Sequence, residues 1–148
     1  MTLSIAIAGA NGRMGAALLA AAAKDTRFAI AGSTTRGATA QTAAADADVW
    51  IDFTTPDATI AALDVLPQTK VRAAIIGTTG LGAEQNARIA EAAKRIAVVY
   101  SGNFSLGVNL LAALVKQAAA KLGPEWDIEI TETHHVRKVD APSGTALM

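Results

Sequence analysis

Short apolar runs rich in β-branched residues alternate with alanine-rich segments along the first hundred residues. Five runs are expected to be strands, at 3–8, 28–32, 48–53, 73–77 and 96–100. Each is apolar almost throughout, as expected of a parallel strand covered on both faces. Helices are expected at about 13–24, 56–66 and 82–95, with only a short helix or a loop between 34 and 48. The alternation predicts an α/β fold with a Rossmann-like, doubly wound parallel sheet.

The pattern changes after residue 100. A long helix with an apolar stripe is expected from about residue 105 to 122, and Gly123-Pro124 ends it. The segment 127–133, DIEITET, alternates strictly between apolar and polar residues, which is typical of a strand with one wet face. We therefore expect residues 1–104 to form a dinucleotide-binding domain. Residues 105–148 are expected to begin a second, α+β substrate domain that remains incomplete.

Composition and charge narrow the function classes. Thirteen basic and thirteen acidic side chains cancel, so no overall field favours nucleic acid or an anionic membrane. The absence of cysteine excludes disulfides, thiolate metal sites and a cysteine nucleophile, and no metal site is predicted. The N-terminus lacks the basic region of a signal peptide, and its apolar run is too short to span a bilayer. We expect a cytoplasmic protein with a small-molecule ligand.

Three glycines, Gly9, Gly12 and Gly15, stand where the first strand should turn into the first helix. A dinucleotide pyrophosphate binds free N–H groups at a helix N-terminus, and side chains at these positions would block its approach. The position therefore favours dinucleotide binding over a plain structural turn. Arg13 stands where a guanidinium could meet phosphate, or is simply a solvated residue of the first turn.

The end of the second expected strand reads GSTTRG, without the carboxylate that usually accepts hydrogen bonds from the adenosine ribose. Hydroxyl groups and Arg36 match a 2′-phosphate better, so NADPH is preferred to NADH, the alternative being a surface arginine in a turn. The loops after the later strands, 52–56, 77–80 and 101–105, carry small hydroxyl residues and glycines. Together they can line a nicotinamide and its ribose, although Thr54 or Thr55 could instead cap a helix.

The segment 133–146, THHVRKVDAPSGTA, holds both histidines of the chain. In a regular strand His134 and His135 would face opposite sides, and both can serve one site only if the chain leaves the strand here, as the DAPSG turn indicates. A helix start at 142–145 would offer uncommitted N–H groups to an anion.

With Arg137 and Lys138 beside it, this segment predicts a site for a carboxylate-bearing substrate, with an imidazole for proton transfer. The alternative is an edge strand whose histidines and cations are solvated.

Motifs along nearly the whole chain resemble the 4-hydroxy-tetrahydrodipicolinate reductase family. The motifs are GANGRMG (9–15), IDFTTP (51–56), GTTG (77–80), NFSLGVNL (103–110) and EITETHHVRKVDAPSGTAL (129–147). The last is highly specific. The resemblance implies hydride transfer from NAD(P)H to ring carbon C4 of the substrate, in the diaminopimelate route to lysine.

The resemblance also implies a role for each matched residue. His134 would be the acid/base residue and Lys138 the proton donor, while His135, Gly144 and Thr145 would contact the substrate's carboxylates. The cofactor-binding residues would be Gly9, Ala10, Asn11, Gly12, Arg13, Met14, Arg36, Gly77, Thr78, Thr79, Ser101, Gly102, Asn103 and Phe104. Thr35 stands where many members have a glutamate, which argues against tight use of NADH.

Members of that family continue for about another hundred residues and form homotetramers through the completed substrate domain. We therefore expect this chain to be an incomplete form of the enzyme. The competing reading is a non-catalytic nucleotide-binding module, or an inactive fragment of the enzyme. A different Rossmann dehydrogenase, such as a homoserine dehydrogenase, would not explain the segment 133–146.

Overall fold

The computed structural model describes residues 2–136, 138 and 141–148. It divides into two compact units, Met1–Tyr100 and Ser101–Met148, which we call the first and the second unit and describe separately. Within the described residues, no helix combines the length and the apolar character that crossing a bilayer would require.

The first unit contains a five-stranded sheet in the order β2-β1-β3-β4-β5, and every neighbouring pair is parallel. The strands are β1 (Leu3–Ile7), β2 (Phe28–Ser33), β3 (Val49–Asp52), β4 (Ala73–Ile76) and β5 (Ala97–Tyr100). All five predicted strands are confirmed, with ends that differ by one residue at most. The chain leaves β1 toward β2 and returns to β3 on the other side. The loops after β1 and β3 therefore open at the switch point, where such sheets bind ligands.

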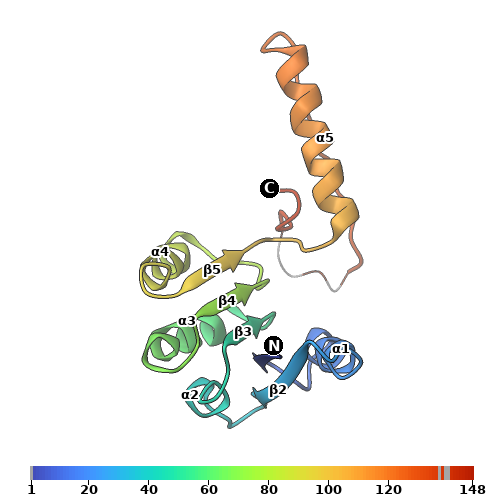
Figure 1. Cartoon of the computed structure of the whole chain (residues 1–148). Helices are drawn as coiled ribbons and strands as arrows, with labels where there is room; N and C mark the ends of the chain where they lie inside the picture. The colour runs from blue at the N-terminus through green and yellow to red at the C-terminus, as the bar shows by residue number, and fades with distance from the viewer. Residues whose placement is uncertain (1, 137, 139–140) are drawn as a thin grey trace. The chain divides into compact units, whose positions relative to one another are not determined.

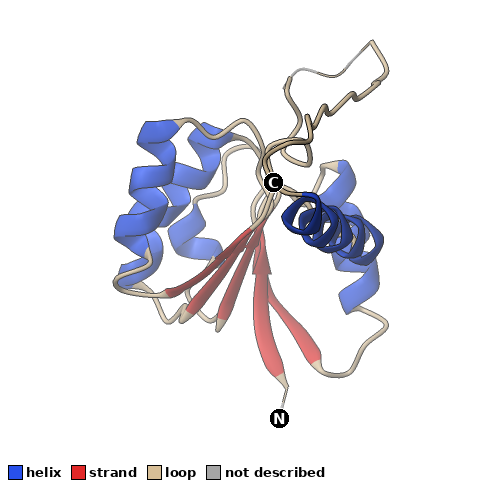
Figure 2. Ribbon diagram, turned by 90° about the horizontal axis from the view of Figure 1, so that it is seen from above, coloured by secondary structure: helices blue, strands red, loops and turns tan. Residues whose placement is uncertain are grey.

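Helices cover both faces of this sheet (Figure 2). They are α1 (Arg13–Ala22), α2 (Ala40–Ala43), α3 (Pro56–Val65) and α4 (Ala83–Ala92), with a 3-10 turn, η1 (Leu66–Gln68), after α3. Figure 1 shows α1 on one side of the strands and α2, α3 and α4 on the other. The short α2 fills the connection in which only a short helix or a loop was expected, and Thr39 caps it by accepting a hydrogen bond from Thr42 N at 3.2 Å.

The alternation of side chains along β1 separates the core into two parts. Ile5 and Ile7 belong to the smaller cluster with Ala22 of α1, whereas Ala6 belongs to the larger cluster under α2, α3 and α4. Trp50 and Leu66 are two of the largest side chains in the larger cluster, and both are buried. Small alanines fill the remaining space, which lets the helices lie close to the sheet.

The second unit begins with a loop and the long helix α5 (Leu106–Leu122), as predicted. Ser105 caps α5, because its hydroxyl accepts a hydrogen bond from Val108 N at 3.5 Å, and Gly123 ends the helix with φ of 79°. No residue of α5 is buried, so the apolar stripe recognised in the sequence is exposed.

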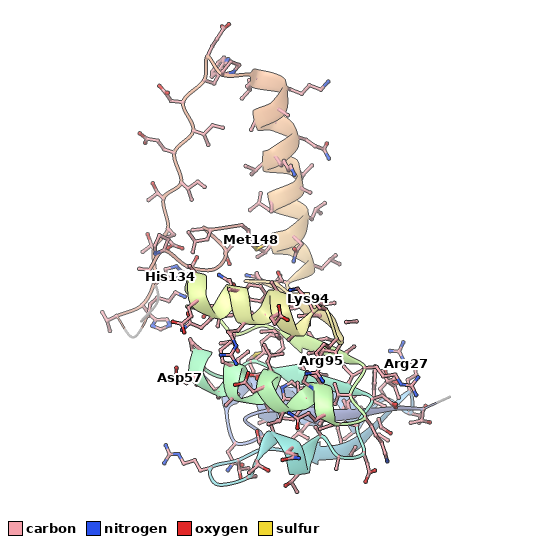
Figure 3. The ribbon with its side chains drawn as sticks, turned by 90° about the vertical axis from the view of Figure 1, so that its left-hand side faces the viewer. Arg27, Asp57, Lys94, Arg95, His134 and Met148 are labelled. Atoms are coloured by element: carbon pink, nitrogen blue, oxygen red, sulfur yellow. The ribbon has the colours of Figure 1, made fainter. Side chains whose placement is uncertain are left out.

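Two local expectations for the second unit were wrong. Residues 127–133 form no strand; they run as an extended chain from the end of α5 toward His134 (Figure 3). A strand needs a partner for its backbone hydrogen bonds, and the described part of this unit contains no other strand. Residues 142–145 form turns rather than a regular helix, although Leu147 N does donate to Ser143 O at 3.1 Å.

Candidate functional site

The loop after β1 is a tight turn whose shape depends on a glycine in the loop and on another in the first turn of α1. Gly9 has a left-handed φ of 66°, and its carbonyl oxygen accepts a hydrogen bond from Gly12 N at 2.8 Å. A Cβ on Gly15 would lie 2.1 Å from that same oxygen. The first turn of α1 can therefore pack directly against the loop only because residue 15 has no side chain.

A cleft of about 840 Å³ opens beside this loop. The cleft is lined by Gly9, Asn11, Gly12, Arg13, Met14, Gly15, Thr34, Thr35, Arg36, Phe53, Thr54, Thr55 and Ala58. Two of these described lining residues carry guanidinium groups and none carries a carboxylate. Gly12, the N-cap of α1, has no side chain to satisfy the first N–H groups of the helix, and the first turn contains no acidic residue. The donors and charges of the cleft therefore suit an anion such as a dinucleotide pyrophosphate.

Thr34 joins the loop after β2 to the glycine loop. Its hydroxyl oxygen accepts a hydrogen bond from Gly9 N at 3.1 Å, and its carbonyl oxygen accepts one from Ala10 N at 2.8 Å. These two bonds bring the segment that contains Thr35 and Arg36 to the same cleft as Arg13. The structure thus assembles the residues from Gly9 to Met14 with Arg36, which the sequence placed in one cofactor site.

The loop after β4 is held by the loop after β3. Gly77 N donates to Asp52 O at 2.8 Å, and the Phe53 ring lies so close to Gly77 that a Cβ there would be 2.0 Å from it. The side chain of Thr78 is buried and shares a 2.7 Å hydrogen bond with the hydroxyl of Thr59 in α3. The Thr78 hydroxyl is therefore already bonded within the protein, and the residue as a whole is only 1% exposed.

In the second unit, two motifs that are about forty residues apart in the sequence lie together. Asn103 Nδ2 donates to Thr145 Oγ1 at 2.8 Å. A Cβ on Gly102 would lie 2.6 Å from Gly144 O, so the two backbones are packed against each other. Ser101 Oγ in turn donates to Asn103 O at 2.8 Å. The loop that contains Phe104 and the predicted substrate-binding Gly144 and Thr145 therefore form one local structure.

Glu132 connects the histidine segment to this structure. Its carboxylate accepts hydrogen bonds from Ser143 N, at 2.8 Å, and from the Ser143 hydroxyl, and it lies 2.8 Å from His134 Nε2. The Ser143 hydroxyl, the His134 ring and the Ser143 N–H group lower the pKa of Glu132 from 4.5 to about 2. The sequence suggested that the N–H groups of the 142–145 turn would be available to a ligand. In the structure the first of them is instead bonded to a carboxylate of the chain itself.

A backbone hydrogen bond joins two of the predicted site residues of the histidine segment. Lys138 N donates to His135 O at 3.0 Å, and Lys138 is half-buried. Arg137, which the sequence placed next to the substrate, lies outside the described residues. The functional candidates that sequence reasoning did not single out are Asp52 and Glu132. Both are carboxylates inside recognised motifs, and for Asp52 the signal was a charged residue at the end of an apolar strand.

Comparisons with known proteins relate the chain to one family. The family model "Dihydrodipicolinate reductase, N-terminus" matches residues 3–104, and "Dihydrodipicolinate reductase, C-terminus" matches residues 107–148. A 4-hydroxy-tetrahydrodipicolinate reductase of Caulobacter vibrioides is 50% identical over 99% of this chain and 60% of its own length. Another, from Methylocella silvestris, is 57% identical over 72% of this chain and 39% of its own length.

Among solved structures, a dipicolinate-bound dihydrodipicolinate reductase from Paenisporosarcina sp. TG-14 superposes with a TM-score of 0.74 at 26% identity. The match covers 99% of this chain and 63% of that one. The chain thus spans less than two thirds of the length of each of these three proteins. The matches to both parts of the family model, which together cover nearly every residue, show that the chain belongs to the dihydrodipicolinate reductase family.

Proposed function

We propose that the chain serves the NAD(P)H-dependent reduction of 4-hydroxy-tetrahydrodipicolinate to tetrahydrodipicolinate, in the diaminopimelate route to lysine. One observation carries the proposal. The cleft beside Gly9 combines the uncapped N-terminus of α1 with the guanidinium groups of Arg13 and Arg36, in a chain of this family. The reduction is proposed for the complete protein in the cytoplasm, where we expect a homotetramer.

The residues of the first unit would hold the cofactor. The N–H groups at the start of α1 would bind its pyrophosphate, and Arg13 lies where it can neutralise a phosphate. The loop that contains Gly77, Thr78 and Thr79 would contact the nicotinamide side. When bound, the cofactor would supply the hydride that takes the place of the hydroxyl at ring carbon C4 of the substrate, and that hydroxyl leaves as water.

The residues of the second unit would hold the substrate and move a proton. His135, Gly144 and Thr145 would bind its carboxylates, and Lys138 would donate the proton that completes the enamine-to-imine conversion. His134 would act as the acid/base residue. Its contact with Glu132 supports this role, because a carboxylate on one ring nitrogen fixes the orientation of the imidazole.

The charge of the cleft supports NADPH as the preferred cofactor. Thr34, Thr35 and Arg36 follow β2 where a carboxylate would otherwise bind the ribose, and the described residues that line the cleft include no acid. We expect Arg36→Ala to raise the NADPH dissociation constant by about tenfold while changing that of NADH by less than about twofold. Arg72→Ala is the control. Arg72 precedes β4 at the amino ends of the strands, whereas the cleft lies beyond their carboxyl ends. Equal losses for both cofactors would refute this preference.

Turnover separates an enzyme from a binding module. The substrate is generated from aspartate semialdehyde and pyruvate by the preceding synthase, and oxidation of NADPH is followed by its absorbance. In a complete homologue, substitution of the equivalent of Lys138 or His134 by alanine should lower kcat by at least about a hundredfold with little change in NADPH affinity. Replacement of the equivalent of Lys121, in the last turn of α5, should leave kcat unchanged. Binding of NADPH without turnover by the 148-residue chain would favour a module for this chain.

A further inference from the structure

Asp52 is a buried carboxylate at the end of β3, with an exposed fraction of 1%. Its Oδ1 atom accepts hydrogen bonds from Thr54 N at 2.9 Å and from Thr54 Oγ1 at 2.6 Å, and its Oδ2 atom accepts one from Trp50 Nε1 at 3.4 Å. A carboxylate is tolerated at such a site only when donors surround it. Asp52 therefore organises the donors around it rather than filling space.

The hydrogen bonds of Asp52 continue into two neighbouring elements. Thr78 Oγ1, in the loop after β4, lies 3.4 Å from Asp52 Oδ1 and 3.2 Å from Thr54 N. The same hydroxyl is 2.7 Å from that of Thr59 in α3, and both threonines are 1% exposed. One buried polar network thus joins the loops after β3 and β4 to α3.

The two residues that follow Asp52, Phe53 and Thr54, pack against glycines of the loops after β4 and β1. The Thr54 Cγ2 atom lies against Gly9, where an added Cβ would be only 2.7 Å from it. Phe53 covers Gly77 in the same way, and Gly77 N donates to Asp52 O. Phe53 and Thr54 line the cleft beside the glycine loop, whereas Asp52 is not among the described residues that line it.

We propose that Asp52 is a positioning residue, whose carboxylate sets the loops after β3 and β4 against Gly9 and so fixes the shape of the cofactor cleft. Asp52 acts through Phe53 and Thr54, which line the cleft. The inference rests on the proposed function, which places a dinucleotide on the glycine loop. A strand end is a favourable place for such a residue, because the sheet holds its backbone while its side chain reaches both loops.

Asp48 provides a matched control on the same strand. Asp48 precedes β3, at the amino end of the strand, where its Oδ2 atom accepts a hydrogen bond from Ser4 N at 3.1 Å. Asp48 and Asp52 are therefore the same residue type, both bonded to backbone N–H groups, at the two ends of one strand. Asp48 is only half-buried, so Asp48→Asn controls for the loss of a hydrogen-bonded carboxylate from this strand at a point away from the cleft.

The test compares Asp52→Asn with Asp48→Asn in the 148-residue chain, by fluorescence titration with NADPH and by urea unfolding. The Asp52→Asn variant keeps the side-chain volume but turns one acceptor into a donor, which then faces either the Trp50 Nε1–H or the donors of Thr54. We expect Asp52→Asn to raise the NADPH dissociation constant by about tenfold in a chain that remains folded, as for the loss of an outer hydrogen-bond partner. Asp48→Asn should lower the urea midpoint and leave the dissociation constant unchanged.

Wild-type NADPH affinity in folded Asp52→Asn would overturn the inference, and so would an equal loss of affinity in Asp48→Asn. Should Asp52→Asn not fold, Thr59→Val removes the hydroxyl at the far end of the network and keeps the side-chain shape. It is expected to raise the dissociation constant by about threefold, since it breaks a single bond that lies away from the cleft, and unchanged affinity would count against the inference.

Failure of the wild-type chain to bind NADPH would contradict the proposed function instead. Amide hydrogen exchange then decides whether Asp52 orders the loops. Faster exchange at Thr54 and Gly77 in Asp52→Asn, but not in Asp48→Asn, would support that part of the inference, and unchanged exchange would refute it.

Discussion

Gly15→Ala is expected to disrupt the glycine loop more than any other single methyl added there. The new Cβ would lie 2.1 Å from Gly9 O, 2.7 Å from Gly9 C and 2.8 Å from Ala10 Cα. All three neighbours are backbone atoms, so no side chain can turn away to make room. To restore an ordinary contact, the loop after β1 and the start of α1 must separate by about 1.3 Å, which is a severe case of overpacking.

The expected magnitudes follow from this displacement. Overpacking of this kind costs about 1–3 kcal/mol of unfolding free energy, while alanine in place of glycine in a helix returns up to about 1 kcal/mol. The N–H groups of α1 that would bind the pyrophosphate move with the helix, and misplacement of a binding group by about 1 Å can cost about a hundredfold. We therefore expect the NADPH dissociation constant to rise by about a hundredfold, with a net loss of about 1–2 kcal/mol in stability.

Two other glycines calibrate the measurement. A Cβ on Gly12 would lie 3.1 Å from Gly9 O, so a shift of a few tenths of an ångström suffices, and Gly12→Ala should weaken NADPH binding by only about threefold. A Cβ on Gly107, in the first turn of α5, would meet only Ser105 Oγ, at 4.0 Å. Gly107→Ala should therefore change neither the NADPH dissociation constant nor the unfolding free energy appreciably. Fluorescence titration and urea unfolding of the three variants give both numbers. If Gly15→Ala binds NADPH as the wild type does, the reasoning from the glycine contacts is wrong.

Three further expectations concern pH, local stability and the core. Since the pKa of Glu132 is lowered to about 2 in the folded chain, its contacts stabilise the Ser143 turn above pH 4.5 and are lost as the pH falls from 4.5 toward 2; an NMR titration of Glu132 with a midpoint near 4.5 would contradict this. Amides of α5, which has no buried residue, should exchange much faster than those of β1 and β3, as native-state hydrogen exchange can show. Leu66→Ala, at a fully buried residue, should cost about 2–5 kcal/mol of unfolding free energy. Leu106→Ala, at a residue that is 85% exposed, should change the unfolding free energy by no more than about 0.5 kcal/mol. Equal losses for the two variants in urea unfolding would show that burial does not determine the loss.

The sheet of the first unit could be predicted because several local signals agree. The run around Ile5 and Ile7 is apolar, is followed by a glycine turn and leads into alanine-rich residues at helical spacing, so length, composition and turn chemistry all indicate a buried parallel strand. The ends of the strands differ by one residue because the backbone ladder stops where the loops turn away. The packing of the glycine loop against α1 was predictable for a similar reason, since Gly15 contacts Gly9 and Ala10, which are only a few residues away.

Contacts between distant residues could not be predicted in the same way. The sequence shows a carboxylate at position 52, but which donors face it depends on how the loops after β3 and β4 pack. Ser143 was expected to offer its N–H group to a ligand, whereas Glu132, eleven residues earlier, accepts that bond. The alternation in 127–133 indicates which side chains would share a face of a strand. It does not supply the neighbouring strand that the backbone needs.

The candidate cofactor residues of the first unit and the candidate substrate residues of the second unit differ in how firmly each unit holds them. The cleft beside Gly9 is formed by backbone turns and is flanked by the buried network around Asp52, so little conformational entropy remains to be lost there when a ligand binds. The predicted substrate residues depend on a few side-chain bonds, from Asn103 to Thr145 and from Ser143 to Glu132, in a segment that is mostly exposed. Ordering that segment costs free energy at the moment of binding. A dinucleotide should therefore bind this chain without a large free-energy cost for ordering the protein. A dicarboxylate should bind more weakly than its charge contacts alone would indicate, because its binding has to order the segment.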